Sequence, residues 1–342
     1  MSASIEDVAK LAGVSIATVS RSLRGLPDVA TATRDKVLAA ARQLDYVASP
    51  FAARLASGRS STVGVVVPFV NRWFFSEVLG AVESVLSAAG YDLLLHNLGD
   101  RDGRERFFSV LPVRKRVDAV LVVSLALTED EVAALNTLEL PVGVLGVKHP
   151  GLSSVRIDDE AAARTAVEHL LSLGHRRIGL IGGDTDDPMR FTPPHHRGTG
   201  YRGALKAAGV SPPEQMECLG YFTVAGGEAA MRQLLAGERP TAVFAESDEM
   251  AYGAIRAIRR AGLRVPQDIA VIGFDDHATA DLMDLTTIRQ PAGEQGAVLA
   301  QALLTALVKD AEPTDVVLET ELVVRGSTVA AASVYAGTAE LD

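Results

Sequence analysis

The sequence has a single cysteine among its 342 residues, Cys218, so an internal disulfide is excluded. No His or second Cys lies near Cys218 at the spacing of a zinc site, and the adjacent His195 and His196 have no carboxylate or Cys partner at a suitable spacing. We therefore expect no metal. The chain also lacks an apolar run of about eighteen residues, the length of a membrane-spanning helix, which predicts no membrane partner.

The sequence also lacks the short motifs of common enzymes and cofactor sites. There is no GxxxxGK followed by Ser or Thr, no GxSxG and no HExxH, and GLIGGD does not complete the GxGxxG spacing of a dinucleotide site. The N-terminus carries Glu6 and Asp7 where a secretory signal would have basic residues before an apolar stretch. These absences predict a cytoplasmic protein that is not an enzyme and needs no cofactor.

Charge is distributed unequally along the chain. The whole sequence has 33 basic and 43 acidic side chains and a net charge of -10. Residues 1–60 hold eight of the basic and five of the acidic side chains, so they carry +3 and the remainder carries -13. A basic first part on an acidic body suits a protein whose first part contacts the phosphates of nucleic acid.

The first part of the chain predicts three short helices. Ser4 and Asp7 have the spacing of a capping box at the start of an apolar stripe, and Gly13 ends that helix. Ser15 can cap a second helix after a very short turn, and a third is predicted from Thr31 to Leu44. Two short helices joined by a Gly-containing turn are typical of a helix-turn-helix. The apolar positions at helical spacing include Ile5, Val8, Ala9, Leu11, Ile16, Val19 and Leu23, and the third helix supplies Val37, Leu38, Ala41 and Leu44 to the core.

Longer strings of this sequence resemble a known family. IEDVAKLAGVSIATVSRSLRG, continued by TRDKVLAAARQLDYVASPFAARLASGRSSTVGVVVP, is similar to the DNA-binding head and hinge of the LacI/GalR family of bacterial repressors. The resemblance continues in GHRRIGLIGG, HHRGTGYRGAL, SDEMAYGAIRAIRRAGLRVPQDIAVIGFDD and LTTIRQP, and so covers essentially the whole chain. It implies a homodimeric repressor on an inverted-repeat operator in double-stranded DNA, since two heads must address half-sites of opposite orientation.

The resemblance implies that the second helix enters the major groove. Arg21 would donate two hydrogen bonds to a guanine, which contributes about 1–3 kcal/mol of discrimination, whereas Ile16 and Ala17 offer apolar contact only. Short hydroxyls suited to caps and phosphate contacts are supplied by Ser15, Thr18 and Ser20.

Two further features follow from the resemblance. Ala30 stands where the family usually has a capping Ser, so Thr31 is expected to cap the third helix one residue later. Residues 49–60 have the pattern of a short hinge helix, which would form only when packed against its symmetry mate and DNA. Leu55 stands where the family inserts a leucine into the minor groove and kinks the operator.

From Thr62 onward short apolar runs alternate with helical segments. Runs such as VGVVVP, VDAVLVVS and DIAVIGF are nearly continuous Val, Ile and Leu, as in strands buried on both faces of a parallel sheet. The pattern predicts a doubly wound α/β architecture. The resemblance implies two parallel-sheet subdomains, as in periplasmic sugar-binding proteins, joined by three crossings near Ile157–Ala161, Thr287–Pro291 and Val316–Leu322.

These observations divide the chain into three parts. Residues 1–48 are the helix-turn-helix domain, 49–60 the hinge, and 61–342 the effector-binding and dimerisation domain. Within the last part, we expect an N-subdomain at about 61–158 and 290–318 and a C-subdomain at about 161–287 and 320–332.

Ligands of open α/β sheets bind beyond the carboxyl ends of the strands, so residues just after the apolar runs are candidates. By motif match to the family, Arg197 and Asp275 would grip the effector. Ser247 replaces an Asn of many relatives, and a hydroxyl lacks the fixed donor–acceptor pair of a carboxamide. Phe74 is expected in the core, and Asp248 and Asp276 either face the ligand or cap helices. Supporting contacts are expected from Asn71, Phe75, Phe222 and Gln290.

The chemistry of these residues suits a carbohydrate, because carboxylate, guanidinium, amide and aromatic groups can bind and stack a polyhydroxylated ring. No pair of basic residues is dedicated to a phosphate. A nucleobase or phosphorylated co-repressor stays an alternative, as does a sugar-binding protein or enzyme without DNA. The C-terminal AASVYAGTAELD has no leucine heptads, which favours a dimer over a coiled-coil tetramer.

Overall fold

The computed structural model describes residues 3–23, 28–46, 59–211, 214–309 and 311–328. The chain divides into two compact units, residues 1–61 with 115–118, and residues 62–114 with 119–342. The hinge helix with Leu55 and the C-terminal tail lie outside the described residues. In the part that is described, no helix is both long and apolar enough to cross a membrane.

The first unit contains three helices, α1 (Ile5–Ala12), α2 (Ile16–Leu23) and α3 (Thr31–Gln43). The capping box at Ser4 is confirmed: its hydroxyl accepts a hydrogen bond from the Asp7 N–H, and the Asp7 carboxylate accepts one from the Ser4 N–H. Gly13 ends α1 with φ 67°, a left-handed conformation that glycine adopts without a Cβ clash. Local sequence thus sets both ends of α1.

The predicted cap of α3 is wrong. The helix already begins at Thr31, and Ala30 occupies the cap position without a side-chain hydrogen bond, because Ala has no acceptor to offer. Two predicted core positions are also wrong, since Leu11 is 46% and Leu38 is 38% exposed. The core of this unit consists of Val8, Ala9, Val19, Val37, Ala40 and Ala41.

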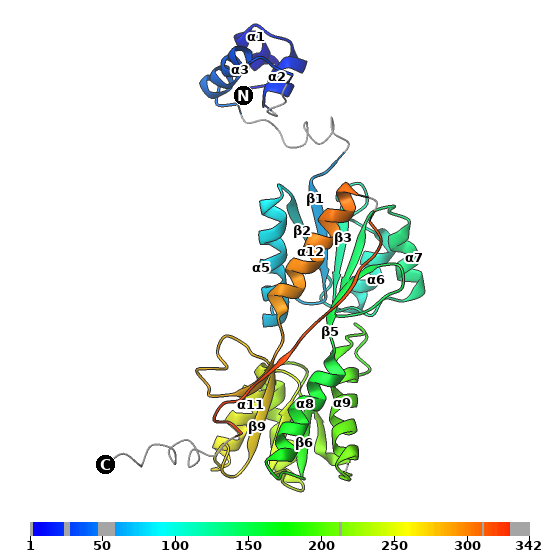
Figure 1. Ribbon diagram of the computed structural model, residues 1–342, viewed down its shortest axis with the longest axis vertical. Coiled ribbons are helices and arrows are strands. Elements are labelled where there is room, and N and C mark those ends of the chain that lie inside the picture. Colours follow the sequence, from blue (N-terminus) through cyan, green and yellow to red (C-terminus); the bar gives the residue numbers. More distant parts are fainter. Residues whose placement is uncertain (1–2, 24–27, 47–58, 212–213, 310, 329–342) are drawn as a thin grey trace, which may run out of the picture. The chain divides into compact units, whose positions relative to one another are not determined.

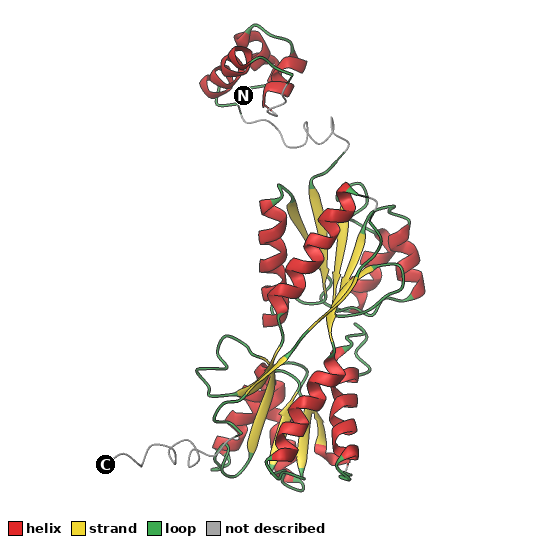
Figure 2. Ribbon diagram, in the orientation of Figure 1, coloured by secondary structure: helices red, strands yellow, loops and turns green. Residues whose placement is uncertain are grey.

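The second unit contains two six-stranded sheets (Figures 1 and 2). The sheet of the N-subdomain has the order β11-β5-β4-β3-β1-β2, and its pairs are all parallel. Figure 1 shows α5 and α12 on one face of this sheet and α6 and α7 toward the other. The elements are β1 (Thr62–Val67), α5 (Trp73–Ala88), β2 (Asp92–Asn97), α6 (Arg101–Val110), β3 (Ala119–Val123), α7 (Glu129–Asn136), β4 (Val142–Leu145), β5 (Ser153–Ile157), α12 (Ala292–Val308) and β11 (Asp315–Leu318).

The C-subdomain repeats this architecture with the order β12-β10-β9-β8-β6-β7. Its helices cover the sheet in two pairs, α8 with α9 and α10 with α11. The edge strand β12 is antiparallel to β10, a departure from the all-parallel expectation. The elements are α8 (Asp159–Ser172), β6 (Ile178–Gly182), α9 (Pro193–Ala207), η1 (Glu214–Met216), β7 (Glu217–Leu219), α10 (Val224–Ala236), β8 (Ala242–Ala245), α11 (Asp248–Arg260), β9 (Ala270–Asp275), β10 (Thr286–Arg289) and β12 (Glu321–Val323).

The doubly wound prediction is confirmed because the central strands are buried throughout. β1, β3, β4, β6, β8 and β9 have no exposed residue, which explains their continuous apolar sequences. The short edge strands β7, β11 and β12 are partly exposed and lack that signal, so no apolar run predicts them. All three of these strands lie at an edge of their sheet.

Three connections join the two sheets of the second unit. The chain leaves the first sheet after β5 and enters α8, returns from β10 to α12, and crosses again from β11 to β12. Each subdomain is consequently built from discontinuous stretches of sequence. The carboxyl ends of the central strands of both sheets border the space between the subdomains, where the pocket described below is found.

Candidate functional site

The exposed face of α2 carries the residues predicted to contact bases. Ile16, Ala17 and Arg21 are exposed, whereas Val19 between them is fully buried. The Ser15 hydroxyl accepts from the Thr18 N–H at 3.2 Å and lies 2.9 Å from the Thr18 hydroxyl, so it caps α2 as predicted. Ser20 is partly buried. The helix thus presents two apolar side chains and one guanidinium on a single face.

Arg21 forms a weak ion pair with Asp28 on the surface of the first unit. Its Nη1 lies 3.6 Å from the Asp28 carboxylate, and both side chains are more than half exposed. An exposed pair of this kind contributes about 0–1 kcal/mol, so it orients the guanidinium without holding it back from another anion or a base edge.

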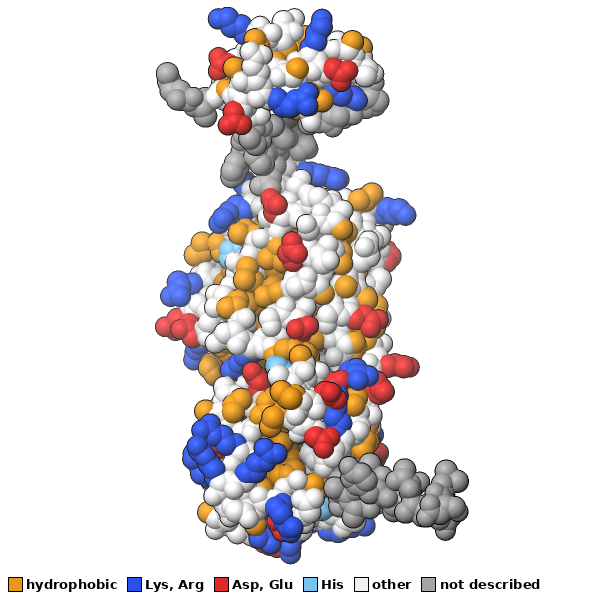
Figure 3. Space-filling model, turned by 90° about the vertical axis from the view of Figure 1, so that its left-hand side faces the viewer, with side chains coloured by type: hydrophobic (Ala, Val, Ile, Leu, Met, Phe, Trp, Pro, Cys, Tyr) orange, Lys and Arg blue, Asp and Glu red, His pale blue; other side chains and the backbone are white. Residues whose placement is uncertain are grey.

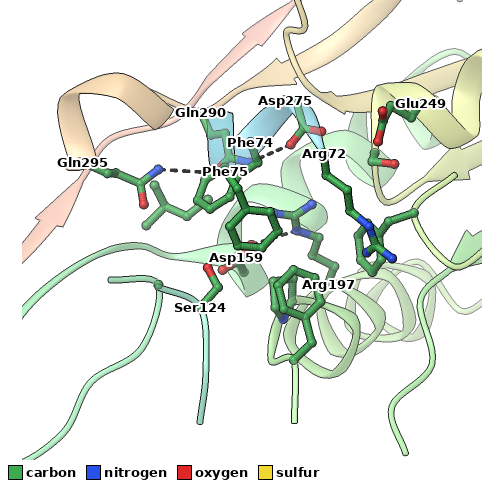
Figure 4. Close-up of a pocket in the computed structure, with 16 residues that line it drawn as sticks. Arg72, Phe74, Phe75, Ser124, Asp159, Arg197, Glu249, Asp275, Gln290 and Gln295 are labelled. Atoms are coloured by element: carbon green, nitrogen blue, oxygen red, sulfur yellow. Dashed lines mark hydrogen bonds and ion pairs between the residues drawn. The ribbon is translucent and has the colours of Figure 1, made fainter. Parts of the chain in front are cut away.

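A pocket with about 560 Å³ of empty space, its open mouth included, lies between the two subdomains of the second unit (Figure 4). Six of the seven predicted ligand residues line it, and the exception is Asn71, which is exposed and absent from the lining. Ser124, Gly146 and Gln290 follow directly after strands, as expected for parallel sheets whose strand ends share one edge. The predicted residues brought together are Phe75, Arg197, Phe222, Ser247, Asp275 and Gln290.

Arg197 is the best-held side chain of the pocket. It is 4% exposed, its Nε donates to the Asp159 carboxylate at 2.7 Å, and its Nη1 donates to the Glu246 carbonyl. Its guanidinium also stacks on the Phe274 ring at 3.5 Å from the ring centre. These contacts fix one edge of the guanidinium fork in the wall of the pocket.

Asp275 ends β9 and is joined to two glutamines. Its Oδ1 accepts from the Gln290 Nε2 at 2.6 Å, and the Gln290 carbonyl accepts from the Gln295 Nε2 at 3.2 Å. Burial raises the pKa of Asp275 to about 7, although the charge of Arg197 opposes the shift. The chain of amides fixes which oxygen and nitrogen atoms face a ligand, and Figure 4 shows it along one side of the pocket.

Phenylalanine rings form the apolar wall. Phe75 contacts Phe74 and Phe191 with ring centres 5.4 and 6.1 Å apart, and Phe191 meets Phe222 edge-on at 5.2 Å. Phe74 was expected only in the core, but it lines the pocket while also packing on the core of the N-subdomain. Aromatic faces of this kind can stack on the C–H face of a sugar ring or on a planar base.

Several lining residues were missed by the sequence reasoning. Asp159 and Ser124 follow β5 and β3, so the rule of strand ends could have indicated them. Arg72 and Glu249 lie on one side of the pocket (Figure 4). Burial lowers the pKa of Arg72 and raises the pKa of Glu249, and the opposite charge of each residue opposes the other's shift. Phe191 lies in a loop with no pattern to mark it.

The serine and aspartates at the ends of β8 and β9 have distinct roles. Ser247 caps α11, accepting from the Met250 N–H at 3.3 Å, and also lines the pocket. Asp248 is fully buried behind it and accepts from the Thr287 hydroxyl at 2.7 Å and the His277 N–H at 2.8 Å. Asp276 pairs with Arg289 and Arg325. Neither aspartate is an N-cap, and neither lines the pocket.

Three non-glycine residues that line the pocket have a backbone with positive φ. Asp275 has φ 124°, and Ser124 and Phe222 have φ 51° and 53°, conformations that cost non-glycine residues about 1–3 kcal/mol each. Gly146 also has positive φ, and a Cβ there would meet the Ser124 Oγ at 2.9 Å. Such strain is typical of ligand sites, where surrounding packing holds side chains in place.

The described residues contain no group of three or more His, Cys, Asp or Glu side chains able to hold a metal ion. The first unit is a helix-turn-helix with an exposed face on α2. The second unit has a polar pocket between two α/β subdomains. This combination defines the class of ligand-responsive DNA-binding regulators.

Comparison with known proteins agrees. Residues 4–49 match the bacterial regulatory proteins of the lacI family, and residues 167–328 match the periplasmic binding protein-like domain. The transcriptional repressor CytR of Escherichia coli is 36% identical over 95% of this chain and 96% of its own. The transcriptional regulator CelR of Thermobifida fusca is 37% identical over 94% of this chain and 97% of its own.

Solved structures agree as well. A Lac repressor dimer bound to operator and an anti-inducer has a TM-score of 0.87 and 28% identity, covering 96% of this chain and all of its own. A CelR–cellobiose complex has a TM-score of 0.70 and 35% identity, covering 95% and 99%. The chain belongs to the lacI family of bacterial regulatory proteins, and it is a DNA-binding transcriptional regulator, not an enzyme.

Proposed function

We propose that this regulator is a cytoplasmic repressor whose affinity for an inverted-repeat operator is controlled by a neutral carbohydrate in the pocket between its subdomains. The observation that carries the proposal is the combination of Arg197, Asp275 and Gln290 with a wall of phenylalanine rings. A sugar ring has hydroxyls for paired hydrogen bonds at its edge and C–H groups for an aromatic face. A relative was solved with cellobiose, which supports this ligand class.

The operator would be read by α2. We propose that Arg21 reads a guanine, that Ile16 and Ala17 contact thymine methyl groups, and that Ser15, Thr18 and Ser20 contact phosphates or hold the helix. Residues 1–48 would form this domain, with 49–60 as the hinge that places Leu55 in the minor groove. Exposure of Ile16 and Arg21 on one face supports the assignment.

We propose a homodimer formed through residues 61–342. Large apolar side chains are exposed on this part of the chain, including Leu282 at 84% and Tyr221 at 53%. Figure 3 shows apolar side chains gathered over both subdomains on the side where Figure 1 places α5 and α11. Exposed apolar surface of this kind is typical of subunit interfaces. The Lac repressor, a structural relative, was solved as a dimer on its operator.

Control would follow from the position of the pocket. A ligand held by both subdomains stabilises one of their relative orientations, and the orientation sets the separation of the two hinge segments in the dimer. The coupling free energy between effector and operator is expected to be about 1–3 kcal/mol, a change in affinity of roughly 5- to 150-fold. The two bodies that would move relative to each other are the N-subdomain, at about 61–158 and 290–318, and the C-subdomain, at about 161–287 and 320–332.

The test combines a ligand screen with an operator assay. An operator is selected from random DNA, and thermal stabilisation is then measured across sugars, sugar phosphates and nucleobases, since a ligand at 100 times its Kd stabilises by about 2.7 kcal/mol. A sugar that both stabilises the protein and changes operator affinity supports the proposal. A nucleobase or phosphorylated hit contradicts the carbohydrate assignment and leaves DNA binding standing.

A matched variant separates the two sites. Asp275→Ala should keep wild-type operator affinity and lose the response to the effector, because Asp275 lies in the pocket and α2 belongs to the other unit. Operator affinity is measured by fluorescence anisotropy with and without the hit from the screen. Retention of the full response in Asp275→Ala would contradict the assignment of this pocket.

A further inference from the structure

The loop between β6 and α9 contacts the opposite subdomain. By chain order, residues 183–192 belong to the C-subdomain, since they join β6 to α9. The Phe191 ring nevertheless packs on the core of the N-subdomain, with its centre 6.1 Å from that of Phe75. The N–H of Ala126, a residue that follows β3 of the N-subdomain, donates to the Arg190 carbonyl at 3.2 Å. Noncovalent contacts of this loop therefore join the two subdomains beside the pocket.

A tight turn within the loop leaves two carbonyls for partners outside it. The Asp187 carboxylate accepts from the Met189 N–H at 2.7 Å, and the Asp187 carbonyl accepts from the Arg190 N–H at 2.7 Å. Because both N–H groups are used within the turn, the groups that it offers to the N-subdomain are the carbonyls of Met189 and Arg190. Met189 is 2% exposed, and a buried carbonyl without a donor is costly, so the N-subdomain has to supply the donors.

Arg104 of α6 supplies the donor for the Met189 carbonyl. It is 4% exposed, its Nη1 donates to the Met189 carbonyl, and its Nη2 donates to the Ala126 carbonyl at 2.7 Å. Its Nε and Nη2 also donate to the two carboxylate oxygens of Glu131, each at 2.7 Å. Glu131 is itself held by the capping box of α7, which it forms with Thr128. One planar guanidinium thus ties α6, α7 and the end of β3 to a loop of the C-subdomain.

We infer that Arg104 is a positioning residue of the pocket: it holds the 183–192 loop against the N-subdomain, so that Phe191 stays in the pocket wall before any ligand binds. Phe191 and Pro193 line the pocket, whereas Arg104 does not. A wall that is fixed in advance spares a ligand the entropic cost of ordering it, which raises the affinity for any ligand that fits. The inference holds whatever the chemistry of the ligand, and so goes beyond the proposed carbohydrate function.

The test compares two variants that differ only at position 104. Arg104→Met combined with Glu131→Gln removes the guanidinium and leaves neither charge of the buried pair without its partner. Glu131→Gln alone is the matched control that keeps Arg104, and glutamine can serve in a capping box as glutamate does. Full-length proteins with no ligand added are compared by hydrogen–deuterium exchange, resolved to single amides by mass spectrometry.

Two amides of one segment separate positioning from general loosening. The Ala126 amide reports the contact between subdomains, and the Ser124 amide is the internal control, because it donates to the Leu145 carbonyl within the N-subdomain at 2.7 Å. Ala126 should exchange about tenfold faster or more in the double variant than in Glu131→Gln, since hydrogen bonds from a charged donor are lost. Ser124 should exchange equally in both. Equal Ala126 rates in the two variants would overturn the inference, and so would an equal acceleration of both amides, which would show loosening of the N-subdomain as a whole.

A third variant tests the contact from the other side and leaves the buried ion pair untouched. Asp187→Ala removes the acceptor of the Met189 N–H and loosens the turn, so Ala126 should exchange about threefold faster or more than in the wild type, with Ser124 unchanged. Wild-type exchange at Ala126 in Asp187→Ala would show that the turn does not hold the loop in place, and would overturn the inference.

Discussion

Replacing Glu246 by glutamine should stabilise the protein at alkaline pH. Glu246 follows β8, is 1% exposed, and accepts a hydrogen bond from the Gly183 N–H at 2.9 Å. Burial raises the pKa of this carboxyl group from 4.5 to about 8, although the Gly183 hydrogen bond and the charge of Arg197 oppose the shift. Glutamine keeps the shape and the acceptor oxygen and removes the charge.

The magnitude follows from proton linkage. Between pH 4.5 and about 8 the folded state keeps a proton that the unfolded chain has lost, so the free energy of unfolding falls as the pH rises through this window. At 1.36 kcal/mol per pKa unit, ionisation of this one group should lower the free energy of unfolding by about 3 kcal/mol between about pH 5 and about pH 8. The wild type should show that loss and Glu246→Gln should not.

The assay is urea unfolding followed by circular dichroism at several pH values and one protein concentration, because dimerisation would make stability concentration-dependent. Other groups titrate in both proteins, so the quantity of interest is the difference between wild type and variant. Glu238→Gln is the control, since the Glu238 side chain is 61% exposed. A difference that does not change with pH, or a variant less stable than wild type near pH 8, would refute the reasoning from burial.

Two further substitutions test the two candidate sites. Asp159→Ala leaves Arg197 buried without its carboxylate partner, so the free energy of unfolding should fall by about 3–5 kcal/mol, checked by urea unfolding, and effector binding should be lost. Asp159→Ala with wild-type stability would contradict the buried ion pair. Arg21→Ala should remove about 1–3 kcal/mol of discrimination at one guanine per half-site, measured by anisotropy on operators with and without that guanine. Equal preference in wild type and variant would show that Arg21 reads no base.

The sequence alone predicted those features that depend on residues close together in the chain. The capping box of Ser4, the glycine at position 13 and the Ser15 cap depend on residues three or four positions apart, and the structure contains all three. Buried parallel strands leave a continuous apolar run, so the central strands of both sheets could be predicted, and the family motifs indicated Arg197 and Asp275. The class of protein therefore follows from the sequence.

Only the tertiary structure decided which side chains meet. The partner of Arg197 is Asp159, 38 residues earlier and on another helix, and no spacing in the sequence joins them. Phe74, predicted as a core residue, lines the pocket. Phe191, which lies in a loop, also lines it and contacts Phe75, because packing of distant segments determines which side chains are exposed. Local sequence thus sets helices, strands and caps, whereas burial, pKa and the shape of the binding site depend on contacts between segments far apart in sequence.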